Sequence, residues 1–236
     1  MAAAPKVVEV KGSDGQMSLN VWEQAGDGPK PAVIVIQEIF GVDDHIKDIA
    51  GRLADAGYVA AAPDLFYRDG KNASVPYSDF DRARELRGHI EDGPLTVDLQ
   101  ATFDYLSSQP GVDSSRIGII GFCFGGRVTF LAAERIKGIA AAAPFYPGGF
   151  ENLIDDVASI GCPIAGFFGN DDKNPSPEVV DQMVEALNKA GKQVEVNRFD
   201  GAGHGFMCTD RGSYNEAAAT AAWPKVIDFF GRTLGK

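Results

Sequence analysis

The stretch around which the chain is organised reads Gly121-Phe122-Cys123-Phe124-Gly125-Gly126. The apolar, β-branched run 117–120 precedes it and the helix-compatible run 127–134 follows it, so we expect a strand, a tight turn and a helix. This is the setting of a nucleophile elbow, with Cys123 where Ser often stands. The glycines let the helix pack closely, and its N-terminus then favours a thiolate or an oxyanion at the sulfur. Cys123 is therefore a candidate nucleophile, and the structural alternative is an ordinary strand–helix turn beside a buried cysteine.

Composition excludes several classes of protein. The 236 residues are 44% hydrophobic and 23% charged, which is typical of a globular chain. The net charge is −11 and no basic run of five or more occurs, which argues against nucleic acid or an anionic membrane as the partner. No apolar run approaches about 18 residues and the chain does not start with a signal-peptide pattern. Three widely spaced cysteines (Cys123, Cys162 and Cys208) form neither a disulfide framework nor a zinc pattern, so we expect a cytoplasmic protein with reduced thiols.

Predicted strands and helices alternate along most of the chain. The predicted strands are 6–10 and 16–22, which form a hairpin, then 32–36, 58–62, 117–120, 138–143, 162–169 and 193–199. The first predicted helix begins after residues 43–44 and ends by residue 57. The other predicted helices cover 78–90, 95–106, 127–134, 176–191 and 215–233. This alternation predicts an α/β fold, with a mostly parallel sheet, helices on both faces and an antiparallel N-terminal hairpin. No linker or repeat interrupts the pattern, so we expect one domain over 1–236.

Reactive side chains follow four of the predicted strands. They are Glu38, Cys123, one of Asp171 and Asp172, and His204. The carboxyl ends of parallel strands lie at one edge of a sheet, where ligands bind. The order nucleophile, acid, histidine is that of the α/β-hydrolases. We therefore expect a catalytic triad at this edge.

His204 is the histidine best placed for acid–base chemistry. His45 and His89 lie on predicted polar helices, whereas His204 lies between glycines in a loop after a strand. An imidazole can accept and return a proton near neutral pH when a carboxylate orients its other nitrogen. Asp171 and Asp172 both suit that role, and chemistry alone does not separate them.

Five motifs together carry a resemblance to a known family. They are residues 37–41 (QEIFG), 121–126 (GFCFGG), 169–172 (GNDD), 201–206 (GAGHGF) and 211–215 (RGSYN). On these motifs the chain resembles the dienelactone hydrolases (carboxymethylenebutenolidases), a family of α/β-hydrolases, over nearly its whole length. Cysteine at the elbow together with glutamate after the third strand is specific to this family.

The resemblance implies roles for individual residues. The family's acid lies three residues after a glycine that ends a strand, which from Gly169 selects Asp172. Glu38 is expected to accept a hydrogen bond from the resting thiol and to take its proton when substrate arrives. The backbone N–H groups of Ile39 and Phe124 are expected to form the oxyanion hole.

One departure from the family's pattern affects the substrate. Members that cleave dienelactone hold the substrate carboxylate with two arginines, and one of these should follow His204 by four residues, where this chain has Cys208. Arg211 is our candidate for that role, and Arg84 is our candidate for the other. Loss of a bidentate arginine weakens recognition of an anionic lactone. The sequence therefore defines the type of reaction better than it defines the substrate.

We predict a cysteine-dependent hydrolase of ester or lactone bonds that works through a thioester acyl-enzyme. Its expected partner is a small-molecule ester or lactone, its expected state a monomer or small homo-oligomer, and it needs no metal and no organic cofactor. The alternatives are a short-chain carboxylesterase or thioesterase of the same fold, and a non-catalytic thiol-sensing or binding protein. Hydrolysis assays with the Cys123→Ala and His204→Ala variants separate the enzyme from the binding protein.

Overall fold

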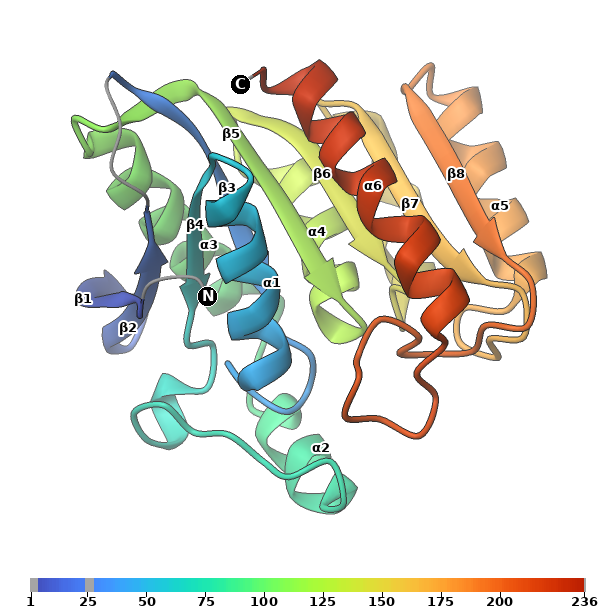
Figure 1. Ribbon diagram of the computed structural model, residues 1–236, viewed down its shortest axis with the longest axis horizontal. Helices are drawn as coiled ribbons and strands as arrows, with labels where there is room; N and C mark the ends of the chain where they lie inside the picture. Colours follow the sequence, from blue (N-terminus) through green and yellow to red (C-terminus); the bar gives the residue numbers. More distant parts are fainter. Residues whose placement is uncertain (1–3, 24–27, 236) are drawn as a thin grey trace.

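The computed structural model describes residues 4–23 and 28–235, and within them a single twisted sheet forms the centre (Figure 1). Its eight strands lie in the order β1-β2-β4-β3-β5-β6-β7-β8. The strands are β1 (Lys6–Gly12), β2 (Gly15–Trp22), β3 (Lys30–Ile36), β4 (Val59–Pro63), β5 (Val112–Phe122), β6 (Ile139–Phe145), β7 (Ile164–Gly169) and β8 (Val194–Phe199). The pairs β1–β2 and β2–β4 are antiparallel and all the others are parallel. The predicted sheet with its N-terminal hairpin is confirmed.

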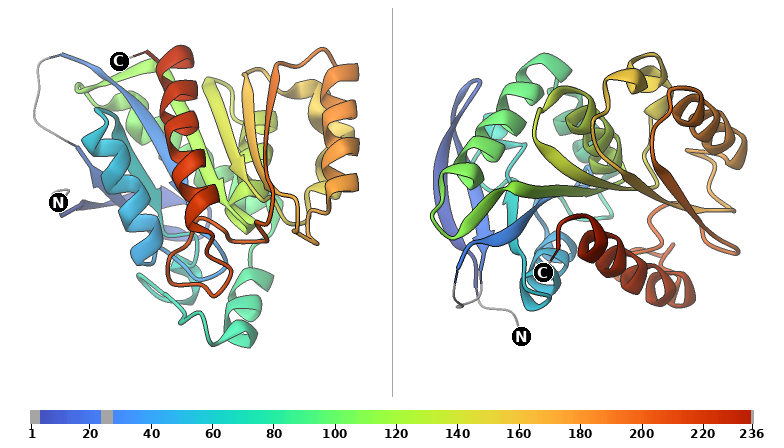
Figure 2. Two further views of the ribbon diagram at one scale, coloured as in Figure 1. Left: turned by 45° about the vertical axis from the view of Figure 1, so that its right-hand side comes forward. Right: turned by 90° about the horizontal axis from the view of Figure 1, so that it is seen from above.

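Helices cover both faces of this sheet, as the sequence predicts. They are α1 (Asp44–Asp55), α2 (Phe80–Gly88), α3 (Asp92–Ser108), α4 (Phe124–Arg135), α5 (Pro177–Lys189) and α6 (Glu216–Thr233), with 3₁₀ segments η1 (Tyr67–Asp69) and η2 (Phe150–Ser159). Seen from above, α1 and α6 lie on one face, and α3, α4 and α5 on the other (Figure 2). No helix in residues 4–23 and 28–235 combines the length and the apolar character needed to cross a membrane.

The central strands are buried on both faces, which explains their continuous apolar sequence. In β3, Ala32, Ile34 and Ile36 pack into the core beneath α3 and α4, whereas Val33 and Val35 pack into the core beneath α1 and α6. Successive side chains of a strand point to opposite faces, so each strand contributes to both cores. An uninterrupted β-branched run is therefore the pattern expected of a covered parallel strand.

Local signals set where helices begin. The side chain of Asp43 accepts a hydrogen bond of 3.0 Å from the backbone N–H of Ile46, and Ser176 caps α5, whose first residue is Pro177. Several boundaries differ from the prediction. The strand that leads to the elbow starts at Val112 rather than Ile117, and α3 and α4 each begin three residues before the predicted position. The 3₁₀ segments η1 and η2 were not predicted.

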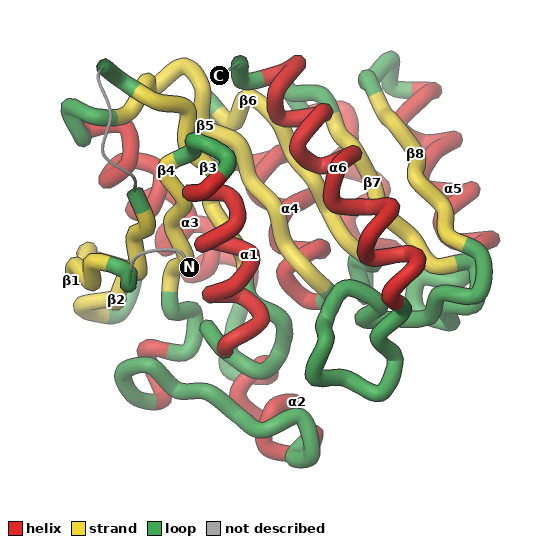
Figure 3. The backbone as a smooth tube through the Cα atoms, viewed as in Figure 1, coloured by secondary structure: helices red, strands yellow, loops and turns green. Residues whose placement is uncertain are grey.

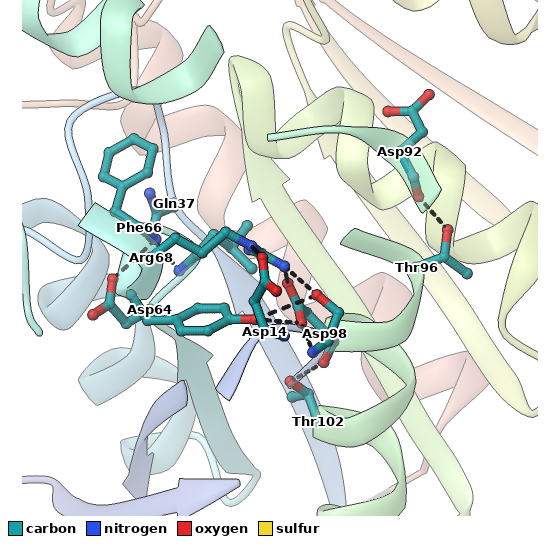
Figure 4. A network of polar contacts seen from close by, with 12 residues as sticks. Asp14, Gln37, Asp64, Phe66, Arg68, Asp92, Thr96, Asp98 and Thr102 are labelled. Atoms are coloured by element: carbon teal, nitrogen blue, oxygen red, sulfur yellow. Dashed lines mark hydrogen bonds and ion pairs between the residues drawn. The ribbon is translucent and has the colours of Figure 1, made fainter. Parts of the chain in front are cut away.

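A buried carboxylate ties the N-terminal hairpin to the rest of the fold (Figure 4). Asp98 of α3 is inaccessible to solvent and accepts hydrogen bonds from the Ser13 backbone N–H (2.8 Å), the Tyr67 hydroxyl (3.1 Å) and the Arg68 guanidinium (2.8 Å). Each hydrogen bond of this network replaces one that the same group makes with water in the unfolded chain. The hairpin, the segment after β4 and α3 are thereby joined at one point.

The long loops gather at the carboxyl ends of the strands (Figure 3). The segment 64–79 follows β4, and the segment 200–215 follows β8. This edge is where an open parallel sheet places its ligands.

Candidate active site

The turn after β5 adopts the strained backbone of a nucleophile elbow. Cys123 has φ 55° and ψ −116°, a conformation that costs an L-residue free energy. Its partly exposed side chain stands between β5 and α4, which begins at the next residue. A Cβ atom on Gly121, Gly125 or Gly126 would lie 2.1, 2.5 or 2.4 Å from a backbone carbonyl oxygen. The three glycines are therefore required for α4 to approach its neighbours.

The structure distinguishes between the two acids that follow β7. Asp172 is 4% exposed, and its Oδ2 lies 3.0 Å from Nδ1 of His204. Its Oδ1 accepts a hydrogen bond of 2.8 Å from the backbone N–H of Asn174, which fixes the carboxylate plane. Asp171 is exposed. Of the two candidates, the structure brings Asp172 to the histidine.

His204 is held between a carboxylate and a thiol. Burial acts to lower the pKa of His204, but its hydrogen bonds with Asp172 and Cys123 outweigh burial and raise the pKa to about 10. The edge of the Tyr146 ring packs against the imidazole, with ring centroids 5.1 Å apart. The ring is therefore oriented from two sides, and its raised pKa favours the protonated form at neutral pH.

Glu38 is completely buried beside the elbow. Its Oε1 accepts a hydrogen bond of 3.1 Å from Nη1 of Arg211, whereas Oε2 has no hydrogen-bond partner in the described part of the chain. Burial raises the pKa of Glu38, and the positive charge of Arg211 opposes that effect. We expected Glu38 to bond to the resting thiol. In this structure it bonds to Arg211 instead, and Cys123 is the thiol that acts on the pKa of His204.

The two loops that carry the expected oxyanion-hole donors touch each other. Phe124 is the first residue of α4, and Ile39 lies in a turn closed by a bridge between Glu38 and Gly41. A Cβ atom on Gly125 would lie 2.5 Å from the carbonyl oxygen of Gln37, so the turn after β3 abuts the start of α4. The backbone of both loops is thus near Cys123.

Comparison with known proteins agrees with these observations. The sequence model of the dienelactone hydrolase family matches residues 19–234. The chain belongs to the dienelactone hydrolase family. It is a hydrolase of the carboxymethylenebutenolidase type, and the resemblance read from its motifs is confirmed.

Relatives of similar length share about a third of its residues. A protein of Synechocystis sp. named "Putative carboxymethylenebutenolidase" is 35% identical, and the alignment covers 97% of this chain and 96% of the relative. The protein of the same name from Escherichia coli K12 is also 35% identical, and the alignment covers 94% of this chain and 84% of the relative. The crystal structure of a "Putative Dienelactone Hydrolase" from Klebsiella pneumoniae superposes with a TM-score of 0.86 at 30% identity, covering 98% of this chain and all of the other.

The arginines of α2 differ from our expectation for this dienelactone hydrolase family member. Arg84, the residue we selected, is 71% exposed, and its guanidinium contacts Asp81 and the ring of Phe80 on its own helix. Arg87 instead lies 4.5 Å over the ring of Phe124, the residue after the elbow cysteine. Burial lowers the pKa of Arg87, and the repulsion of Arg127 adds to this effect. The structure thus brings Arg87 to the elbow and leaves Arg84 at the surface.

Helical geometry contained a signal for Arg87 that we did not use. Successive residues turn by about 100°, so Arg87 lies within about 40° of Ala83, one of the two buried residues of α2. Arg84 lies about 160° from Leu86, which is the second buried residue of α2. The buried stripe of the helix excludes Arg84, and the stacking on Phe124 identifies Arg87 as the arginine that faces the site.

A buried thiol occupies the position where the family pattern has a cation. Cys208 is inaccessible to solvent and donates a hydrogen bond of 3.1 Å to the Tyr77 hydroxyl, which in turn donates one of 2.6 Å to Oδ2 of Asp43. Burial raises the pKa of the Cys208 thiol. Cys208 therefore anchors the loop that carries Tyr77 and brings no positive charge to the site.

Proposed function

We propose that this family member hydrolyses small ester or lactone substrates with Cys123 as the nucleophile and His204 and Asp172 as its partners. The observation that carries the proposal is the imidazole of His204, which hydrogen-bonds to the acid and is close enough to Cys123 for that thiol to raise the pKa of the imidazole. A nucleophile, a base and an orienting acid in contact are the signature of covalent catalysis.

The proposed reaction proceeds in two steps. The Cys123 sulfur attacks the carbonyl carbon, the C–O bond to the leaving group breaks, and His204 gives its proton to the leaving alkoxide. Water then attacks the thioester carbon, His204 takes a proton from that water, and the C–S bond breaks to release the carboxylic acid. The backbone N–H groups of Ile39 and Phe124 are the proposed oxyanion donors, each worth roughly 2.7–4 kcal/mol in the transition state.

Glu38 is the proposed acceptor for the thiol proton. Its unpartnered Oε2 and its raised pKa support this role, since burial without a second hydrogen bond makes the carboxylate a better base. Arg211 at Oε1 limits that effect. When an anionic substrate draws Arg211 away, Glu38 becomes more basic and takes the thiol proton, and it returns that proton to the sulfur after the C–S bond of the thioester breaks.

The substrate class that we propose is an ester or lactone with one carboxylate. Among the described residues the Arg87 guanidinium makes one hydrogen bond, of 3.3 Å, to the carbonyl oxygen of Ile90. It stacks on Phe124, which places it where it can bind an anion near the nucleophile. Arg211 is engaged by Glu38. The names of the relatives, carboxymethylenebutenolidases, agree with a small anionic lactone.

A neutral short-chain ester or thioester is the second candidate. The buried thiol of Cys208, where a second carboxylate-binding arginine is expected, favours it. For either substrate we propose a cytoplasmic enzyme that is a monomer or small homo-oligomer and acts without nucleic acid or membrane.

Trapping of the acyl-enzyme tests the proposal. The enzyme is mixed with p-nitrophenyl acetate or dienelactone, quenched in acid and mapped by mass spectrometry. We expect the added acyl mass on Cys123, no turnover in Cys123→Ala and an adduct that persists in His204→Ala. The Cys208→Ser variant is the matched thiol control and should acylate as the wild type does. Undiminished hydrolysis by Cys123→Ala would refute the mechanism.

A further inference from the structure

A buried ion pair lies one helical turn after the nucleophile and takes no part in the reaction proposed above. Arg127 is 7% exposed, and its backbone N–H donates a hydrogen bond of 3.3 Å to the carbonyl oxygen of Cys123. Its guanidinium donates two hydrogen bonds, of 2.8 and 2.7 Å, one to each carboxylate oxygen of Asp92, the first residue of α3. This bidentate geometry is among the strongest that arginine forms with a carboxylate, so Arg127 occupies both oxygens of Asp92.

The two partners of this pair depend on it unequally. Arg127 lies in the first turn of α4, where the partial positive charge of the helix end makes a cation unfavourable, and Asp92 compensates that cost. Asp92 lies in the first turn of α3, where a negative charge is favourable, and its side chain is 34% exposed. Its carboxylate also points away from the network around Asp98 (Figure 4). Without Arg127, Asp92 would therefore stay charged and would be open to another cation.

Arg87 is the cation that competes for this carboxylate. Burial and the charge of Arg127 lower the pKa of Arg87, whereas the charges of Asp92 and Cys123 act in the opposite direction. Of these groups Asp92 is the only carboxylate. Because Arg127 holds Asp92, the Arg87 guanidinium lies instead 4.5 Å over the ring of Phe124, beside the nucleophile. The place of Arg87 in the site thus depends on which arginine Asp92 binds.

We propose that Arg127 is a positioning residue for anionic substrates: it binds both oxygens of Asp92 and so keeps that carboxylate from capturing Arg87. The inference rests on the proposed function, in which Arg87 binds the carboxylate of the substrate. A carboxylate of the same chain has a high effective concentration, whereas the substrate is dilute. An Asp92 that was free to pair with Arg87 would therefore compete with the substrate and raise KM for anionic esters alone.

Steady-state kinetics of Arg127→Met with two esters of the same size, one with a carboxylate and one neutral, test the proposal. The variant keeps an apolar stem but frees Asp92, so KM for the anionic ester should rise by about fivefold or more, and KM for the neutral ester by less than about twofold. Arg127→Lys keeps the charge without the bidentate contact and should give a smaller rise. Arg135→Met is the matched control, because the charge of Arg135 on the same helix also acts on Asp92 while its guanidinium contacts Thr96. Both KM values of Arg135→Met should stay near those of the wild type.

The double variant Arg127→Met/Asp92→Asn separates positioning from a structural role. With the charge of Asp92 removed as well, no carboxylate competes for Arg87, and KM for the anionic ester should return to within about twofold of the wild type. A structural role predicts that the double variant is no better than Arg127→Met.

An unchanged KM for the anionic ester in Arg127→Met, or no recovery in the double variant, would overturn the proposal while the substrate class proposed above stands. An unchanged KM for the anionic ester in Arg87→Leu would instead refute that substrate class, and this proposal with it. A crystal structure of Arg127→Met should show the Arg87 guanidinium paired with Asp92, and an Arg87 still stacked on Phe124 would contradict the proposal.

Discussion

Arg211 and Glu38 form an ion pair that is almost sealed from water, although 173 residues separate them in the chain. The Nη1–Oε1 distance is 3.1 Å, and the side chains are 13% and 0% exposed. Removal of one partner of such a pair leaves a buried charge without compensation. We predict that Arg211→Met lowers the free energy of unfolding at pH 7 by about 3–5 kcal/mol in urea denaturation. Arg198→Met, whose partner Asp181 is well exposed, should cost less than about 1 kcal/mol.

The pH dependence of the same variant gives a second test of this pair. Burial raises the pKa of Glu38, and without Arg211 that rise should be larger. The folded state then binds a proton more readily than the unfolded chain, so folding of Arg211→Met is favoured as the pH falls from 7 toward 4.5. The difference in unfolding free energy between the wild type and Arg211→Met should therefore decrease as the pH falls over this range. A constant gap would show that charge burial is not the cause of the loss.

The hydrogen bond between His204 and Asp172 should be visible in both rate and stability. Asp172→Asn is expected to lower kcat for ester hydrolysis by about 10²- to 10⁴-fold, because the imidazole loses its orienting charge. The exposed neighbour provides the control, since Asp171→Asn should stay within about twofold of the wild type.

The corresponding stability difference should depend on pH with a defined sign. The folded pKa of His204, about 10, lies above its value in an unfolded chain, about 6.5. The stabilisation is therefore complete below about pH 6.5 and is lost as the pH rises through about 10. The unfolding free energies of wild type and Asp172→Asn should differ most at low pH within this window. A difference that grows toward pH 10 would contradict the assignment.

The glycines of the elbow should tolerate no side chain. In Gly126→Ala the new Cβ would lie 2.4 Å from the carbonyl oxygen of Phe145, so either β6 or α4 must move. We predict a loss of at least about 2 kcal/mol in unfolding free energy, together with loss of activity. Gly231→Ala in α6 is the matched control. It meets nothing within 4 Å and should stabilise the protein by about 0.5–1 kcal/mol.

Arg87 and Arg84 are a matched pair on one helix. Replacement of Arg87 by leucine should raise KM for an ester that carries a carboxylate by about tenfold or more, while KM for a neutral ester of the same size changes little. Arg84→Leu should leave both values near those of the wild type, because that side chain points to solvent. If Arg84→Leu raises KM for the anionic ester more than Arg87→Leu does, Arg84 is the carboxylate-binding residue, as the sequence analysis predicted.

The sequence predicted the layered fold because its signals are local. The apolar run of β3, the Asp43 cap and the glycine-rich elbow each act over a few residues and agree with one another. Where the structure differed, the cause was a contact between distant segments. The partner of Glu38 comes from the far end of the chain, and Arg87 is distinguished from Arg84 by the side of α2 that packs on Phe124.

The buried carboxylate of Asp98 has a consequence for the order in which the chain can assemble. Its partner Ser13 leaves the ribosome 85 residues earlier, and the hairpin of β1 and β2 cannot be fastened until α3 has been synthesised. The turn between the first two strands therefore has no anchor until the segment with Asp98 has been made. We expect nascent chains shorter than about a hundred residues to need protection from aggregation at this hairpin.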